Sequence, residues 1–500
     1  MASVLIPLAV VLLFVAAFIL FRTAIYTSSE PDYQPAPLVE VDSLTIAEHL
    51  GRIVRCETVS VADPEHGDWR NFKGLKQELA SIYPRLHRTF LVETVNKHSL
   101  LYTWPGSNPE LDPLLFAAHM DVAPVEPGSE AAWEHPPFSG EIADGFIWGR
   151  GVLDDKCSVT GLMEAVETLI QQGFHPERTL YLALGHDEEL TGIHGAGEIA
   201  RLLAERGVRL EAVFDEGGFL VSGILDGVTR PVAMVGIAEK AYLSIELRVT
   251  SSGGHSSAPQ TPTAIGRLSR AIQRLEAHPM PARLDYLAWQ MDYLASELPF
   301  AMRILMANRW MFGGLIRRSA AAKPTTNAMI RTTTAPTIIH GGMQENVLPS
   351  EAHAVVNFRL LPGDSIPRVI EHVTHAIADK EVHLRVLTLP GDLAQDAEAP
   401  DAPSATVAIS DTGGPVFPLL AEAIRQVFPE AVVSPYLVFG ATDSRYYTRL
   451  CSQVFRFLPV RIAADDLQRV HGANERLALK NCGDMVQFYH RLIATLAGKG

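Results

Sequence analysis

The chain has 500 residues, of which 47% are hydrophobic and 20% charged, and its formal net charge is −15. This composition excludes an intrinsically disordered chain, and the length predicts two or more domains. The negative charge argues against nucleic acid as a partner. The four cysteines, Cys56, Cys157, Cys451 and Cys482, are too few for a disulfide scaffold. We expect them to be mostly free, with a single disulfide as the alternative in an oxidising compartment.

The first segment, residues 1–22, is predicted to be a transmembrane anchor. Met1 to Phe21 contains no charged side chain, and about 20 apolar residues suffice to cross a bilayer as a helix. An uncleaved anchor is favoured over a cleaved signal peptide, because no basic residue precedes the apolar run and no clear small-residue cleavage site follows it. The alternatives are a signal peptide, which would give a secreted protein, and a buried core helix. Residues 23–40 are predicted to be a linker.

Residues 41–240 alternate between helix-like and strand-like patterns. The predicted strands are Thr89–Val95, His98–Thr103, Leu114–Ala118, Thr179–Leu184 and Val213–Phe214, and the predicted helices are Ser43–Cys56, Asn71–Tyr83, Cys157–Gln172 and His194–Gly207. This order predicts an α/β domain with a mostly parallel sheet covered by helices. Functional sites in such sheets form at the carboxyl ends of the strands.

Residues 241–400 have a different pattern, which predicts a small ferredoxin-like domain with the order β-α-β-β-α-β. Its predicted strands are Tyr242–Thr250, Ala335–His340, Ala352–Leu361 and Val382–Leu389, and its predicted helices are Thr263–Glu276 and Ile366–Asp379. Pro400–Pro403 is a predicted hinge. Residues 401–500 return to the pattern of the first domain, with a helix at Pro415–Val427, an apolar stretch at Ala431–Phe439 and a long final helix. The small domain is therefore predicted to be inserted into the large one.

A long insertion at residues 278–326 interrupts the small domain. It carries large apolar side chains at Trp289, Tyr293, Phe300, Met302, Leu305, Trp310, Met311 and Phe312. Three interpretations are open: additional core, an apolar wall for a lipophilic substrate, or a patch that faces a membrane.

The chemistry is expected around the acids Asp187, Glu188 and Glu189, which follow a predicted buried strand. Adjacent buried carboxylates repel one another and lose hydration, so a cation should lie among them. We predict a two-metal site with the ligands His119, Asp154, Glu189, Asp215 and His471. Asp154 would bridge the two ions, because the oxygens of a carboxylate diverge. One ion would then take His119 and Asp215, and the other Glu189 and His471.

Two further acids have predicted catalytic roles. Asp121 lies two residues after His119, on the same side of an extended strand, and can orient its imidazole. Glu188 is next to a predicted ligand but should point elsewhere, so it is the candidate general base. Each motif alone, such as one His-x-Asp or one Glu-Glu pair, is common on protein surfaces. Their joint occurrence after predicted strands is what favours a site.

At these residues the chain resembles the di-zinc family of carboxypeptidases and aminoacylases. The matching segments are Ala118-His-Met-Asp-Val-Ala-Pro124, Trp148-Gly-Arg-Gly-Val-Leu-Asp-Asp-Lys156, Gly185-His-Asp-Glu-Glu189, Ser252-Gly-Gly-His-Ser-Ser257 and Gly342-Met-Gln-Glu-Asn-Val-Leu-Pro349. The resemblance covers the chain after about residue 40. It implies a zinc-exopeptidase-like catalytic domain, an inserted lid and dimerisation domain, two Zn²⁺ per subunit at the five ligands above, and the roles given to Asp121 and Glu188. It also implies a cis peptide at Asp154–Asp155.

The resemblance also implies residues for substrate recognition. His255 would complete the oxyanion site, often across a homodimer, by donating a hydrogen bond. Asn346 and Arg359 would hold the free carboxylate of the substrate, although Arg359 could instead pair with a surface acid. Thr442, in the segment Gly440–Ser444, would line the pocket.

Within the family, the insertion and the segment Arg331-Thr-Thr-Thr-Ala335 most resemble carboxypeptidase S and N-fatty-acyl amino acid synthase/hydrolase. The predicted function is hydrolysis of the amide bond of an N-acyl or fatty-acyl amino acid, with the reverse reaction left open. One alternative is a short-peptide carboxypeptidase. An alternative of another class is an inactive, membrane-tethered binding protein.

Overall fold

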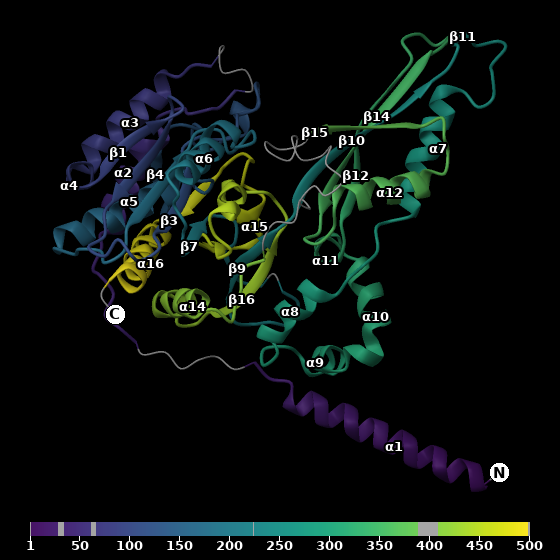
Figure 1. Cartoon of the computed structure of the whole chain (residues 1–500), viewed down its shortest axis with the longest axis horizontal. Helices are drawn as coiled ribbons and strands as arrows, with labels where there is room; N and C mark the ends of the chain where they lie inside the picture. Colours follow the sequence, from purple (N-terminus) through teal and green to yellow (C-terminus); the bar gives the residue numbers. More distant parts are fainter. Residues whose placement is uncertain (1, 29–34, 62–66, 224, 389–408, 499–500) are drawn as a thin grey trace.

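The chain folds around two separate sheets, and the first helix extends away from both (Figure 1). The computed structural model describes residues 2–28, 35–61, 67–223, 225–388 and 409–498. The larger sheet has ten strands and the next has four. Strands β1 to β3, β6 to β9 and β16 to β18 form the larger sheet, whereas the strands of the four-stranded sheet all come from the chain between β9 and β16. The part of the chain that forms the four-stranded sheet thus lies between the two parts that form the larger sheet.

The larger sheet is mixed, with a parallel centre formed by β6, β3, β7 and β17. Its order is β1-β2-β6-β3-β7-β17-β9-β8-β18, with β16 parallel to β9. The bounds are β1 (Leu91–Val95), β2 (Ser99–Trp104), β3 (Leu114–His119), β6 (Leu180–Gly185), β7 (Ala212–Asp215), β8 (Leu220–Val221), β9 (Val232–Glu239), β16 (Val432–Val438), β17 (Val454–Arg456) and β18 (Arg461–Ile462). The α/β class is therefore confirmed, and β8, β9, β17 and β18 are strands that the sequence pattern did not identify.

Helices cover this sheet, and their bounds are α2 (Ser43–Val54), α3 (Arg70–Ile82), α4 (Pro84–Thr89), α5 (Lys156–Gln171), α6 (Glu198–Glu205), α14 (Val416–Val427), α15 (Ala464–Leu467) and α16 (Leu479–Ala497). Helix α5 is buried on nearly all sides, because it packs against β3, α2 and α16. A Cβ at Gly161 would lie 2.7 Å from Cγ of Met485, so this glycine permits the close approach of α5 and α16. The predicted helix His194–Gly207 is divided into a π-helical turn, η3 (Ile193–Gly197), and α6.

The four-stranded sheet has the order β12-β14-β10-β15, and all its pairings are antiparallel. Its elements are β10 (Ala241–Thr250), α7 (Ala264–Ala277), β12 (Thr333–Gly341), β14 (Glu351–Leu360), α12 (Ile366–Ile377) and β15 (His383–Thr388), which is the predicted β-α-β-β-α-β order. Alternate residues of β14 are buried, because one face of the sheet packs against α7 and α12. A short pair, β11 (Gly254–His255) and β13 (Val347–Leu348), forms the distal tip of this domain (Figure 1).

The insertion folds into four helices between the two sheets and the first helix (Figure 1). They are α8 (Asp285–Tyr293), α9 (Phe300–Ala307), α10 (Arg309–Ala321) and α11 (Pro324–Ile330). Helix α8 packs against β16 of the large sheet, and α9 packs against the N-terminal helix α1 (Ala2–Ile25). The insertion therefore joins the large domain to α1.

Several predictions about domain limits differ from the structure or lie outside it. Helix α1 continues to Ile25, so the helical segment is longer than residues 1–22. The predicted hinge Pro400–Pro403 and the boundary at residue 400 lie outside the described residues. The four cysteines are free. Among the described residues, one helix has the length and hydropathy to cross a membrane, over Leu5–Ile25, and most of its large apolar side chains are exposed.

Candidate metal centre

The candidate site lies where neighbouring parallel strands of the large sheet end. Strand β3 ends at His119, which is in register with Gly185, the last residue of β6. Strand β7, on the other side of β3, ends at Asp215. Because the carboxyl ends of parallel strands share one edge, the acids that follow β6 and β7 are brought beside His119.

Asp154 lies at the centre of this group. Its Oδ1 is 2.9 Å from Nε2 of His119, and its Oδ2 is 3.0 Å from Nε2 of His471. The same nitrogen of His471 is 3.1 Å from Oε2 of Glu189. His119, Asp154 and Glu216 form one set, and Asp154, Glu189 and His471 form another, with the ligand atoms of each set within 4.8 Å of one another. The shared carboxylate and the second set are those the sequence predicts.

Glu216 takes the place that the sequence analysis gave to Asp215, so the prediction for Asp215 differs from the structure. Oε1 of Glu216 lies 3.9 Å from Nε2 of His119. Oδ2 of Asp215 instead accepts a hydrogen bond from the backbone N–H of Ser444, at 2.8 Å. Asp215 is the last residue of β7, and its carboxylate is occupied by this backbone contact, whereas Glu216, one residue beyond the strand, faces His119. The sequence contains both acids side by side and no signal that chooses between them.

The segment that presents Asp154 is held by Glu475, whose role the sequence analysis did not identify. Oε1 of Glu475 accepts hydrogen bonds from the backbone N–H groups of Gly151 and Leu153, at 3.0 and 2.8 Å. Its Oε2 forms an ion pair with Arg150 at 2.7 Å, and Arg150 also donates to the carbonyl of His471. Gly151 has φ +87°, and a Cβ there would lie 2.4 Å from Cγ1 of Val122. These contacts fix Asp154 and His471 relative to each other. The peptide between Asp154 and Asp155 is cis, as the resemblance implies.

Asp121 contacts His119 and the backbone of the two acids that follow β6. Nδ1 of His119 lies 3.0 Å from the backbone carbonyl oxygen of Asp121 and 3.4 Å from its Oδ1, so Asp121 orients the imidazole with Nε2 facing Asp154. The two carboxylate oxygens of Asp121 also accept hydrogen bonds from the backbone N–H groups of Glu188 and Glu189, at 3.2 and 3.1 Å. Oε1 of Glu189 accepts from the N–H of Ala123 at 2.8 Å, which leaves Oε2 directed at His471. Asp121 therefore positions both a histidine and the following pair of acids.

The electrostatics of the group favour cations. Burial raises the pKa of Glu188 and of Glu216, and the nearby carboxylate of Asp154 raises both further. Burial also opposes ionisation of Asp154, but hydrogen bonds with His119 and His471 outweigh it and lower the pKa of this carboxyl. Hydrogen bonds with Asp154 and Glu189 raise the pKa of His471 to about 10. The carboxylates beside them thus favour a proton on His119 and on His471. Divalent cations would replace these protons, because a histidine ligand is neutral and a carboxylate ligand is ionised.

Four predicted residues do not join this group within one chain. His255 and Asn346 are exposed at the tip formed by β11 and β13, which Figure 1 places far from β3 and β7. Arg359 lies on β14, with its guanidinium 4.7 Å from the ring centre of Tyr242. Thr442 is buried, and both its N–H and its hydroxyl contact the carboxylate of Glu239, at 3.0 and 3.2 Å.

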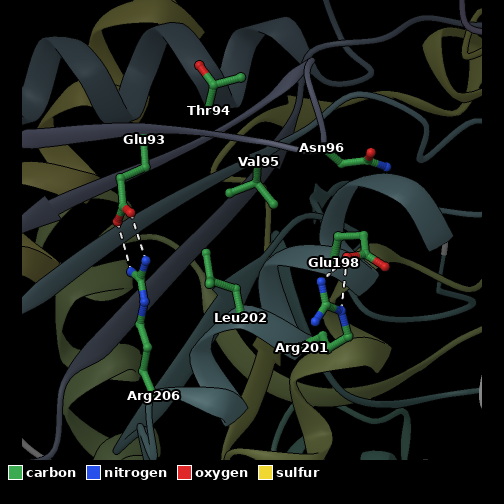
Figure 2. Close-up of a pocket in the computed structure, with 8 residues that line it drawn as sticks. All are labelled: Glu93, Thr94, Val95, Asn96, Glu198, Arg201, Leu202 and Arg206. Atoms are coloured by element: carbon green, nitrogen blue, oxygen red, sulfur yellow. Dashed lines mark hydrogen bonds and ion pairs between the residues drawn. The ribbon is translucent and has the colours of Figure 1, made fainter.

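A separate surface hollow of about 420 Å³ lies between β1 and α6 (Figure 2). Arg206 pairs with Glu93 across it, and Arg201 pairs with Glu198. The charges that line the hollow are therefore already compensated, and the hollow is distinct from the acid and histidine group.

Comparisons with known proteins point to one family. Residues 115–495 match the family described as Peptidase family M20/M25/M40. Probable carboxypeptidase S-like 2 of Dictyostelium discoideum is 37% identical over 485 residues, covering 95% of this chain and 91% of that protein. The human N-fatty-acyl-amino acid synthase/hydrolase PM20D1 is 37% identical over 464 residues, covering 92% and 89%. The crystal structure of the M20 family metallo-carboxypeptidase Sso-CP2 from Sulfolobus solfataricus has a TM-score of 0.62 at 17% identity, covering 91% of this chain and 99% of that one.

Zinc binding can test whether Glu216 or Asp215 is the metal ligand. We expect Glu216→Gln to lower the affinity for one of the two zinc ions. The loss should exceed the roughly 10- to 100-fold typical of residues that only orient ligands. Asp215→Asn keeps an oxygen that can accept from the N–H of Ser444, so both ions should stay bound. Equilibrium dialysis at limiting zinc measures both variants. A stoichiometry that falls for Asp215→Asn and not for Glu216→Gln would restore the original assignment.

Proposed function

Because the chain belongs to peptidase family M20/M25/M40, we propose that it is a two-zinc hydrolase that cleaves an amide bond next to a free carboxylate. The observation that carries the proposal is the position of Asp154 between two sets of ligand atoms that share its carboxylate. Imidazole and carboxylate ligands in these numbers suit zinc. Three carboxylates against two dications leave one net positive charge at the site. When bound, the ions would supply Lewis acidity at the reacting carbonyl.

Glu188 is the proposed general base. Its backbone N–H is fixed by Asp121, and its carboxyl is close enough to His119 and Asp154 for their charges to affect its pKa. Burial raises that pKa above its ordinary value, which strengthens the carboxylate as a proton acceptor. Glu188 would take a proton from the attacking water and pass it to the leaving nitrogen. The adjacent Glu189 is directed at His471, so the two acids have separate tasks.

Arg359 is the proposed partner of the substrate carboxylate. Burial lowers the pKa of its guanidinium, and the positive charge of Arg445 lowers it further. Among the described residues, no acid forms an ion pair with Arg359, which argues against the alternative of a surface salt bridge. A carboxylate would offset the repulsion between the two arginines, and a planar guanidinium can bind it through two hydrogen bonds. Thr442 is proposed to shape this region through Glu239 instead of contacting the substrate.

His255 and Asn346 are proposed to act across a homodimer. Both lie at the exposed tip of the small domain, and Nδ1 of His255 contacts Ser257, at 2.8 Å from its hydroxyl. The opposite ring nitrogen, Nε2, would then face outwards, towards another chain. The imidazole of one chain could then donate a hydrogen bond to the oxyanion that develops in the site of the second chain. A homodimer with two-fold symmetry would supply one such histidine to each site.

The names of the relatives supply two substrate classes. A fatty-acyl amino acid and a short peptide both carry an amide bond beside a free carboxylate, so the same centre suits either. We favour the N-fatty-acyl amino acid, in hydrolysis or the reverse reaction, and retain the short-peptide carboxypeptidase as the second candidate. The protein is proposed to be held at a membrane by α1, whose apolar length over Leu5–Ile25 is 21 residues.

The role of Glu188 predicts a specific kinetic defect. Glu188→Gln should lower kcat by about 10²- to 10⁴-fold while both zinc ions stay bound, because proton transfer is lost and the ligands are kept. The assay compares N-oleoyl-phenylalanine with Gly-Leu on zinc-loaded protein. Cleavage of the acyl amino acid alone supports the favoured substrate, and cleavage of the dipeptide alone supports the carboxypeptidase. Equal, measurable rates for the variant and the wild type would remove Glu188 from this role. If the wild type holds no zinc and cleaves neither substrate, the inactive binding protein is the better interpretation.

The proposed contact between Arg359 and the substrate carboxylate predicts a defect in substrate binding. Arg359→Ala should raise KM about 10- to 100-fold for substrates with a free carboxylate and change kcat less, because a charged hydrogen-bonding partner is removed. The matched substrate is the same acyl amino acid as its primary amide. Since the amide lacks the negative charge, its kcat/KM should fall little. An equal fall for both substrates would show that Arg359 does not recognise the carboxylate.

The dimeric site predicts complementation between two inactive variants. A chain with His255→Ala keeps its own Glu188, and a chain with Glu188→Gln keeps its own His255. If His255 acts across the dimer, co-expression should restore about a quarter of the wild-type rate, because half of random dimers contain one complete site. Each variant alone is the control. Restoration should fail if His255 acts within its own chain.

A further inference from the structure

We propose that α9 and α10 of the insertion form a lipid-embedded platform, which enters the bilayer interface beside α1 and fixes the protein at the membrane. The inference rests on the proposal that α1 spans the membrane, and it goes beyond it by assigning a second membrane-binding element. The platform is defined by Phe300, Trp310, Met311 and Leu315, all of which are exposed large apolar side chains.

The end of α1 is built into the folded protein. The hydroxyl of Thr23 is 3.3 Å from Nδ2 of Asn308, and both side chains are buried, with 1% and 0% of their surface exposed. Nε of Arg22 donates to the carbonyl of Ala307 at 3.0 Å. The hydroxyl of Tyr26 donates to Oδ1 of Asp292 at 2.7 Å. A segment destined for removal would not require such partners, so these contacts favour retention of α1.

The depth of the platform follows from the length of α1. Its apolar segment Leu5–Ile25 has 21 residues and is about 31 Å long, close to the roughly 30 Å of a bilayer hydrocarbon core. Since α1 runs from Ala2 to Ile25 and is about 36 Å long, a span of that thickness reaches to within about 6 Å of its end. Phe18 lies about 10 Å from the end of α1 along the helix axis. Its ring meets that of Trp310 edge to face, with centroids 6.3 Å apart. The ring of Trp310 therefore lies beside Phe18, on the bilayer side of the end of α1.

The chemistry of the neighbouring residues suits that depth. Phe300, Met311 and Leu315 present apolar surface, while Trp310 is of the type enriched where hydrocarbon meets headgroups. Arg317 and Arg318 are exposed at the end of α10 and can reach lipid phosphates with their long side chains. The remaining large apolar residues of the insertion, including Trp289 and Tyr293, pack against the core of the large domain. The insertion thus has one side in the protein core and one side beside α1.

The test measures tryptophan quenching in the full chain, reconstituted in phosphatidylcholine vesicles with and without brominated acyl chains. Bromine quenches only tryptophans that approach the lipid chains. Trp310→Phe keeps the aromatic contact with Phe18 and should remove most of the quenching. Trp133→Phe is the control, because Trp133 lies beside Arg150 near the metal centre, and it should leave the quenching unchanged. Unchanged quenching in Trp310→Phe would overturn the platform.

A second pair of variants adds a reporter instead of removing one. In the Trp310→Phe background, Leu315→Trp should restore quenching, whereas Leu91→Trp should not, although Leu315 and Leu91 are similarly exposed at 55% and 61%. An alkaline carbonate wash tests α1 separately. If the protein resists the wash but Leu315→Trp restores no quenching, the platform is overturned and α1 remains the membrane anchor. Release of the protein by the wash would overturn both proposals. Hydrolysis of N-oleoyl-phenylalanine reports on the proposed activity independently of these results.

Discussion

The central constraint in this structure is the burial of several carboxylates in one small volume. An isolated buried carboxylate is strongly destabilising, so each must be compensated. The chain does this in two ways. Asp121 and Glu475 accept hydrogen bonds from backbone N–H groups, and these bonds position the segments that carry other acids. Asp154, Glu189 and Glu216 instead face one another and two histidines. Only the second group leaves ligand atoms directed at shared positions, which is where cations fit.

The large sheet and the small one contribute different kinds of residue. The acids and histidines of the metal centre all belong to the large domain, where parallel strands and the loops that pack on them fix their positions. Arg359 lies on β14 of the small sheet, and His255 lies at its far tip. The two domains meet at the direct connection from β9 to β10. There the buried ammonium of Lys240 donates to the carbonyls of Ala328 and Arg331, at 3.1 and 3.0 Å. Substrate recognition as proposed here thus depends on how the two sheets are held together.

The insertion links this enzyme body to α1. Its helices combine core side chains on one side with a polar contact to α1 and an exposed apolar surface on the other. A single helix attached by a linker would let the body rotate freely above a membrane. The contacts of Thr23 and Asn308 remove part of that freedom, because they fix the end of the helix against the body. The orientation of the catalytic domain relative to α1 is therefore a property of the fold.

The sequence by itself determined the periodic elements and the type of chemistry. The apolar run Leu114–Ala118 favoured a strand, and the acids and histidines placed after such runs favoured a cation site among them. The sequence could not choose between Asp215 and Glu216, because the direction of each side chain depends on how the chain leaves β7, where Gly217 has φ +123°. It also could not assign Glu475, whose partners are more than 300 residues away, or show which side of α10 meets α1. Local patterns record the preference of each segment for a helix, a strand or burial. Only the packing of distant segments decides which atoms face the same point in space.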